Sequence, residues 1–194
     1  MSSTSRRRAW LAPLLIGACA GSTTLAADTY EVDSNHTYPS VETSHMGISM
    51  FRGKFNKTTG TITLDRAAKT GTVEIKIDTS TVDFGHDELN KHLRGPEYFN
   101  VEKFPSATYK GTIKFEGDEP KEIDGQLTLL GVTKPVKLEI EDFKCIQHPF
   151  YKKEACGADA EGEIDRSAFG MTKGVEFGGS KVELDIQVEG LKKS

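Results

Sequence analysis

The sequence lacks the motifs by which several large enzyme classes are recognised. Its 194 residues contain no Gly-x-Ser-x-Gly, no phosphate-binding P-loop and no Gly-x-Gly-x-x-Gly. Nothing therefore indicates a hydrolase nucleophile, a nucleoside triphosphatase or a dinucleotide-binding enzyme. The five histidines, at positions 36, 45, 86, 92 and 148, show no spacing that would bring two of them onto one metal ion. We expect neither an enzyme nor a metal or cofactor.

Clustered positive charge is also missing from most of the chain. The formal net charge is −4, and it falls to −7 without Arg6, Arg7 and Arg8, which are the only charged residues among the first 27. Nucleic acids and anionic membranes are bound through basic patches. An acidic chain with no basic cluster beyond residue 8 argues against both partners.

The N-terminal segment has the pattern of a secretory signal peptide. Its arginines precede a short apolar run over residues 10–20, and small residues then lead to Ala26 and Ala27. The run is too short to span a bilayer. We expect a signal peptide over residues 1–27, cleaved after Ala26 or Ala27, followed by one domain over residues 28–194.

Cysteine is scarce, and its positions agree with export. Cys19 lies in the signal segment, where residues 16–19 resemble a lipobox and offer lipid anchoring as an alternative. Residues 7–8 offer a twin-arginine signal as a second alternative. Cys145 and Cys156 form an even pair that should be a disulfide in an oxidising compartment, rather than two buried thiols. Closing so short a loop would stabilise the fold by ~3 kcal/mol.

Alternation of apolar and polar residues dominates the rest of the chain. It is clearest over residues 122–141, where two alternating arms flank Gly131 and predict a β-hairpin. Pro135 must then stand at the start or on the edge of its strand. Similar alternation predicts further strands over residues 30–32, from 41 onward, 49–55, 60–64, 71–78, 109–115, 158–164 and 182–188.

One segment has a helical period instead. Leu89 and Leu93 lie four residues apart, and Gly95 and Pro96 form a stop signal. These features predict one short helix over residues 83–94, inserted between strands and followed by an irregular stretch.

At least eight strands, each with one apolar face and one polar face, are typical of a sandwich or a closed barrel. Gly111, Gly125 and the alanines and glycines of residues 158–164 place little side-chain volume on the apolar face. A barrel with a void inside would explain this, because a packed core needs bulk at such positions. A core whose gaps are filled by bulky neighbours is equally compatible with the sequence.

Five short motifs occur in a fixed order along residues 28–191. They are Tyr30-x-Val32-Asp33-x-x-His36, residues 41–47 with 53–55, residues 92–100 with 104–109, residues 125–136, and Ile164-x-Arg166-x-x-Phe169-Gly170. Together they resemble the YceI-like, polyisoprenoid-binding proteins of bacteria. The resemblance implies an all-β, lipocalin-like antiparallel barrel of eight strands, exported to the periplasm and often dimeric, which holds a long isoprenoid or similar lipid. Asn100 and Ala168 stand where the family usually has acids, so no role is expected for a carboxylate there.

An apolar lumen makes the inward positions of the predicted strands, the helix and its neighbours candidate ligand contacts. They are Val73, Ile75, Ile77, Leu89, Leu93, Phe99, Ile113, Phe115, Leu127, Leu129, Val136, Leu138, Ile140, Phe169, Leu184 and Ile186.

Four basic side chains within the motifs are candidates for contacts with the polar end of the lipid. They are His36, His45, Arg52 and Arg166. Arginine offers a planar fork for phosphate or carboxylate. The alternative is that these side chains satisfy backbone groups at strand ends or pair with Asp33 and Glu42.

The sequence thus predicts a non-catalytic barrel that binds a long apolar chain for transport, storage or sequestration. An enzyme acting on an isoprenoid lipid and an interaction domain with a filled core are the alternatives. The acidic row Asp159, Glu161, Glu163 and Asp165 is better explained as a solvated strand face than as a cation site.

Overall fold

The computed structural model describes residues 27–194, and the predicted signal sequence, including Cys19, lies outside the described residues. The elements in chain order are β1 (Asp28–Val32), β2 (Tyr38–His45), β3 (Ser49–Phe55), β4 (Thr58–Asp65), β5 (Thr70–Asp78), η1 (Thr79–Thr81), β6 (Val82–Asp83), α1 (Asp87–Arg94), β7 (Ser106–Glu116), β8 (Glu119–Leu129), β9 (Val132–Gln147), β10 (Glu154–Asp165), η2 (Arg166–Phe169), η3 (Val175–Phe177) and β11 (Lys181–Lys192).

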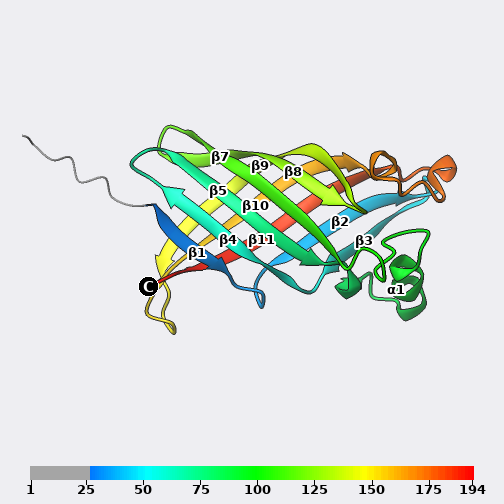
Figure 1. The fold of residues 1–194 in the computed structure, drawn as a ribbon, viewed down its shortest axis with the longest axis horizontal. Helices are drawn as coiled ribbons and strands as arrows, with labels where there is room; N and C mark the ends of the chain where they lie inside the picture. The colour runs from blue at the N-terminus through cyan, green and yellow to red at the C-terminus, as the bar shows by residue number, and fades with distance from the viewer. Residues whose placement is uncertain (1–26) are drawn as a thin grey trace, which may run out of the picture.

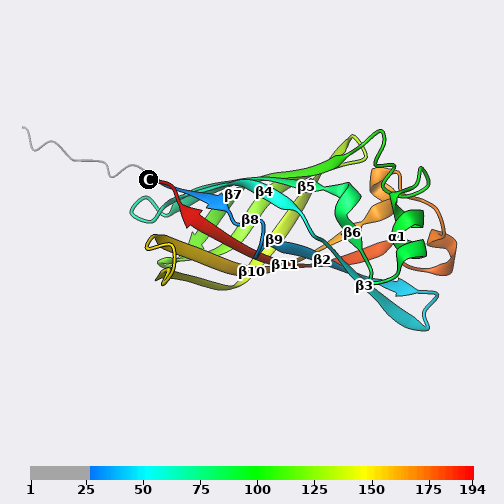
Figure 2. The same cartoon turned by 90° about the horizontal axis from the view of Figure 1, so that it is seen from below.

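The strands form one antiparallel sheet that closes on itself, as Figures 1 and 2 show. β1 and β2 pair in succession with the same strand, β11, at Val32–Gly190 and Tyr38–Gln187. β3 continues through a short bend into β4, and β5 continues through η1 into β6. The short strands therefore merge, and the wall is the closed eight-stranded barrel that the sequence predicts.

The predicted central hairpin is confirmed as β8 and β9. The strands are joined by Leu130 and Gly131, both with left-handed backbone (φ 52° and 76°), as a two-residue turn between twisted strands requires. Pro135 lies opposite Gln126 of β8, whereas the pairing of β9 with β10 begins only at Glu139. Pro135 therefore occupies an edge, as expected for a residue without an N–H.

The predicted helix is confirmed, but its predicted start at residue 83 is wrong. Asp83 pairs with Lys54 of β3, and its carboxylate accepts hydrogen bonds from the Gly85 N–H (2.8 Å) and the Asn90 side chain (2.9 Å). The chain becomes helical only at Asp87, where the His86 ring accepts from the Leu89 N–H (3.2 Å). Leucine spacing cannot locate this start, because a polar side chain decides it.

The disulfide between Cys145 and Cys156 is confirmed. The two residues face each other directly in the ladder of β9 and β10. The bond thus closes the hairpin just before the loop over residues 148–153.

The glycines of the barrel wall admit neighbouring side chains into the interior. A Cβ built on Gly125 would lie 2.2 Å from the Tyr109 ring, and one on Gly162 would lie 2.7 Å from Leu138. The Tyr109 hydroxyl, seated over Gly125, donates toward the carbonyls of Ile123 (3.2 Å) and Val136 (2.9 Å). The missing volume at these glycines is therefore filled locally.

Replacing Gly125 tests this packing. We expect Gly125→Ala to displace Tyr109 and to lower the free energy of unfolding by about 1–3 kcal/mol, as overpacking does. The control is Gly157→Ala on β10, where the nearest atom to an added Cβ lies 3.5 Å away. That change should be neutral or stabilise by up to about 1 kcal/mol. Urea unfolding of both variants measures the two changes in the free energy of unfolding. Equal changes would contradict the close contact between Gly125 and Tyr109.

Candidate functional site

The barrel encloses a cavity of about 460 Å³ with an almost wholly apolar wall. Its lining includes most of the apolar positions predicted from the sequence: Val73, Ile75, Ile77, Leu89, Leu93, Phe99, Ile113, Leu127, Leu129, Val136, Leu138, Ile140, Leu184 and Ile186. The core is therefore not completely filled, although the gaps at the wall glycines are.

Two predicted apolar positions lie beside the cavity and do not line it. Phe115 keeps the alternation of β7 and is partly buried against the core, but it lies beyond the residues that line the cavity. Phe169 is buried among core residues from the short helix η2. Both side chains pack against core residues and do not form part of the cavity surface.

Other lining residues were not identified from the sequence. Tyr30, Leu64 and Tyr109 continue the strand alternation, so the same periodicity would have found them. Met171 and Phe177 come from the segment between β10 and β11, where no periodicity exists to indicate an inward direction.

The cavity opens at one end of the barrel. Its solvent-exposed lining residues all come from the β2–β3 connection and the segment around η3: His45, Met46, Lys173, Phe177 and Gly178. α1 lies at this same end (Figures 1 and 2). Leu89 and Leu93 line the cavity from α1, and Phe99 lines it from the stretch that follows while packing edge-on against Phe55 (5.4 Å between ring centres). We call this end the mouth.

A hydrogen-bonded cluster near the disulfide links side chains of β1 and β10, which flank β11 in the sheet. Tyr30 is buried, and its hydroxyl donates to the Glu154 carboxylate. Arg66 donates to the Tyr30 hydroxyl (2.8 Å) and to Glu154 (3.0 Å), and the same guanidinium nitrogen lies 3.1 Å from the sulfur of Cys145 and 3.3 Å from that of Cys156. Since Tyr30 and Cys156 are lining residues and are buried, the cluster closes this part of the wall to solvent.

The electrostatics of this cluster follow from burial and pairing. Burial raises the pKa of the Tyr30 hydroxyl well above its usual range, with the hydrogen bond to Glu154 adding to the shift. The hydrogen bond from Arg66, together with that from Tyr30, lowers the pKa of the Glu154 carboxyl. Tyr30 is therefore a neutral phenol, hydrogen-bonded to the ionised carboxylate of Glu154 and to the guanidinium of Arg66.

Two of the four predicted polar contacts lie outside the cavity lining. The His36 ring nitrogen Nδ1 lies 2.8 Å from the Asp33 carboxylate, whose hydrogen bond raises the pKa of His36. Arg52 pairs with Glu42 at 2.7 Å. Both exposed side chains therefore pair with neighbouring acids, which is the alternative to ligand contact that the sequence left open.

The other two, His45 and Arg166, do line the cavity at its mouth. His45 stacks on Phe51, with 4.2 Å between ring centres. The Arg166 guanidinium donates to three backbone carbonyls, those of Gly179 (2.6 Å), Met171 (2.9 Å) and Lys173 (2.9 Å). Arg166 therefore holds the segment around η3 in place, with each of its three side-chain nitrogens donating to one carbonyl. A ligand role for the four polar side chains stays a prediction.

Within residues 27–194, no group of three or more His, Cys, Asp or Glu side chains is arranged to hold a metal ion. The acidic row of β10 faces solvent, with Glu163 paired to Lys181 (2.9 Å). No helix in this part of the chain is long and apolar enough to cross a membrane.

The chain is similar to proteins already described. The model of the YceI-like domain matches residues 30–190. Protein YceI of Salmonella arizonae is 39% identical over 174 residues, which is 89% of this chain and 90% of that protein. BcnA of Burkholderia cenocepacia superposes with a TM-score of 0.66 at 23% identity over 81% of this chain and 98% of that chain. A polyisoprenoid-binding domain from Saccharophagus degradans gives a TM-score of 0.61 at 15% identity, over 84% and 98%.

The lowered pKa of Glu154 predicts a pH-dependent stability. Such a carboxylate stabilises the fold fully above the pKa of the unfolded chain, about 4.3, and this contribution is lost as pH falls through the lower folded pKa. Because Arg66 is partly exposed, we expect Glu154→Gln to cost only about 1 kcal/mol at pH 7. The difference from the unsubstituted protein should shrink as pH falls below the unfolded pKa and vanish once pH lies below the lowered folded pKa.

Unfolding in urea at several pH values measures this effect. The control is the same substitution in an Arg66→Met background, where its effect at pH 7 should largely disappear. A cost for Glu154→Gln that persists unchanged at low pH would show that the Arg66 pair does not set it.

Proposed function

The chain belongs to the YceI-like family, and from this premise we propose that it is a non-catalytic protein that holds one long apolar lipid chain, a polyisoprenoid or a similar tail, inside its barrel. The observation that carries the proposal is the apolar cavity, whose 460 Å³ fall within the usual range for ligand sites, ~300–1,000 Å³. The Saccharophagus neighbour, described as a polyisoprenoid-binding domain, supports the choice of ligand class.

Magnitudes favour the tail over the head group as the source of affinity. Each buried methylene contributes ~0.8 kcal/mol, so a dozen carbons contribute on the order of 10 kcal/mol. Immobilising the ligand opposes this by roughly 4–15 kcal/mol, so that only a long tail binds usefully. The cationic side chains at the mouth add little, because each guanidinium nitrogen of Arg166 already donates to a backbone carbonyl and Lys173 pairs with Glu97 at 3.0 Å.

We propose that the protein acts in the periplasm, after removal of its signal peptide, in the transport, storage or sequestration of this lipid. The N-terminal pattern of arginines, apolar run and small residues supports export. The Cys145–Cys156 disulfide supports an oxidising compartment.

Filling the cavity tests the proposal. Leu127 is buried and lines the cavity, so Leu127→Trp should abolish binding because the indole occupies the space of the tail. Gln126→Trp, at the exposed neighbour on β8, is the matched control and should bind normally. Displacement of a fluorescent probe by prenyl alcohols of increasing length is the measurement.

The chain-length dependence gives a second arm of the same experiment. Affinity for the unsubstituted protein should rise with each prenyl unit until the cavity is full, and prenyl phosphates should add little to it. If alcohols fail to bind at every length while short phosphates bind well, the tail is not what the cavity recognises.

α1 and the stretch after it are proposed to gate the cavity. An eight-residue helix is marginal by itself, and Leu89, Leu93 and Phe99 form part of the cavity wall at the mouth. Because gating elements are drawn from the least stable parts of a fold, amides of α1 should exchange faster than those of β8 without ligand and slow markedly with geranylgeraniol bound. Hydrogen exchange is the measurement, and equal protection of α1 in both states would count against gating.

A further inference from the structure

Large apolar side chains are exposed to solvent around the mouth. They are Met46, Ile48 and Met50 of the β2–β3 hairpin and Phe177 of η3, and we call them the rim patch. Ile48 is 81% exposed and Phe177 is 61% exposed. Apolar surface gathered at one place on a soluble protein marks an interaction site more often than scattered exposed residues do.

Contacts hold the two parts of the rim patch together. The Thr43 hydroxyl of β2 donates to the Gly179 carbonyl (3.2 Å), just beyond η3. A Cβ on Gly179 would lie 2.6 Å from the Ser44 carbonyl oxygen, so the backbones of the two segments are in direct contact. Figure 2 shows the β2–β3 hairpin and the segment around η3 at the same end of the barrel, with the hairpin reaching outward. The rim patch is one surface built from two segments.

The turn itself does not require these side chains. β2 and β3 pair up to His45 and Ser49, and the connection has left-handed backbone at Met46 (φ 56°) and Gly47 (φ 71°). Asn or Asp adopts that backbone more readily than methionine does. The Gly47 N–H is already satisfied by the Ser44 hydroxyl (3.1 Å). A polar tip would therefore fold at least as well, and the apolar residues need another explanation.

The rim patch is continuous with the cavity. Met46 and Phe177 are exposed and also line the cavity, whereas Ile48 and Met50 lie outside it. The rim patch therefore begins at the cavity wall and extends outward along the β2–β3 hairpin.

Charge is absent where the patch projects. Residues 43–51 contain no Asp, Glu, Lys or Arg in a chain with 28% charged residues. Across the mouth, Lys173 is paired with Glu97 at 3.0 Å, Arg166 donates to three backbone carbonyls, and Glu176 lies next to Phe177. Burying the tip of the β2–β3 hairpin in an apolar phase therefore desolvates no Asp, Glu, Lys or Arg side chain.

We propose that the rim patch inserts into the surface of a lipid bilayer, so that the mouth meets the membrane and the tail passes between bilayer and cavity without crossing water. This inference rests on the proposed function for its purpose. The size of the patch favours a bilayer over a second copy of the chain, because a stable protein interface uses roughly 20–30 residues a side. Insertion is apolar rather than electrostatic, consistent with the acidic chain.

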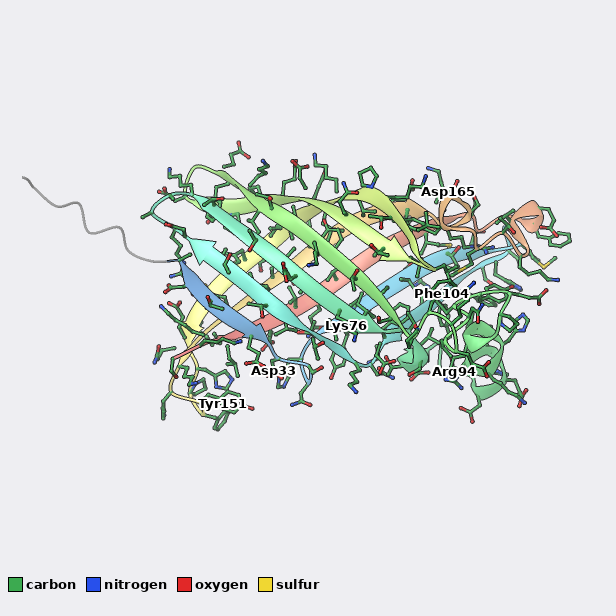
Figure 3. The ribbon with its side chains drawn as sticks, in the orientation of Figure 1. Asp33, Lys76, Arg94, Phe104, Tyr151 and Asp165 are labelled. Atoms are coloured by element: carbon green, nitrogen blue, oxygen red, sulfur yellow. A yellow bond between two sulfur atoms is a disulfide. The ribbon has the colours of Figure 1, made fainter. Side chains whose placement is uncertain are left out.

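The opposite end of the barrel supplies a matched control. Ile146 and Phe150 are exposed apolar side chains (47% and 84%) of β9 and the loop after it. Figure 3 places Tyr151 of this loop far from Arg94 of α1, at the other end of the barrel. Neither Ile146 nor Phe150 lines the cavity.

Flotation of the exported protein with phosphatidylcholine vesicles tests the inference. The unsubstituted protein should float, and Ile48→Ser with Met50→Ser should lower its partition coefficient by about tenfold or more, through lost apolar burial. Ile146→Ser with Phe150→Ser should leave it unchanged. Raising the salt to about 0.5 M, or adding phosphatidylglycerol, should change little, because no ion pairs are involved.

Displacement of the fluorescent probe by farnesol in solution, without vesicles, separates this inference from the proposed function. Both double variants should bind farnesol like the unsubstituted protein. Farnesol binding without flotation would overturn membrane docking alone. Failure of the unsubstituted protein to bind farnesol or any longer prenyl alcohol would overturn the proposed function. Flotation that salt abolishes, or a rim variant that only converts a dimer to a monomer, would also overturn membrane docking.

Discussion

The ladder along β11 is the constraint on which the rest of the structure depends. This one strand pairs with β10 on one side and with β1 and β2 on the other, and so removes the last open edge of the sheet. Closure gives every strand an inside and an outside. Once the sheet is closed, the apolar faces have only one another and the enclosed space to contact.

The enclosed space is not filled, because of how the wall is built. Tyr109 and Leu138 occupy the gaps over Gly125 and Gly162, so that the glycines let side chains settle against the wall. The side chains thereby leave the middle of the barrel open as a cavity. Its polar neighbours, Tyr30 and Arg166 among them, have their hydrogen-bonding groups engaged by the protein itself. The result is a cavity with an apolar wall, which suits the long apolar tail proposed as its ligand.

Strand positions and cavity-facing residues could be read from the sequence where period-two alternation is unbroken. The strand predicted over residues 49–55 coincides with β3, and most apolar positions taken from such strands line the cavity. Phe115 follows the same alternation and packs against the core, but it does not line the cavity. The start of α1 depends on the bonding of Asp83, and the mouth depends on Phe177, in a segment without periodicity. Such local polar bonds and loop conformations leave no pattern in a single sequence.

The central claim is that the cavity holds a long apolar lipid in the living cell. The most direct test is native mass spectrometry of protein purified from the periplasm without detergent, followed by organic extraction and identification of the released material. The account predicts a mass increment of one lipid per barrel, and an extract that contains an isoprenoid or a similar long chain. Protein at its bare polypeptide mass, with an extract free of any such lipid, would contradict the account.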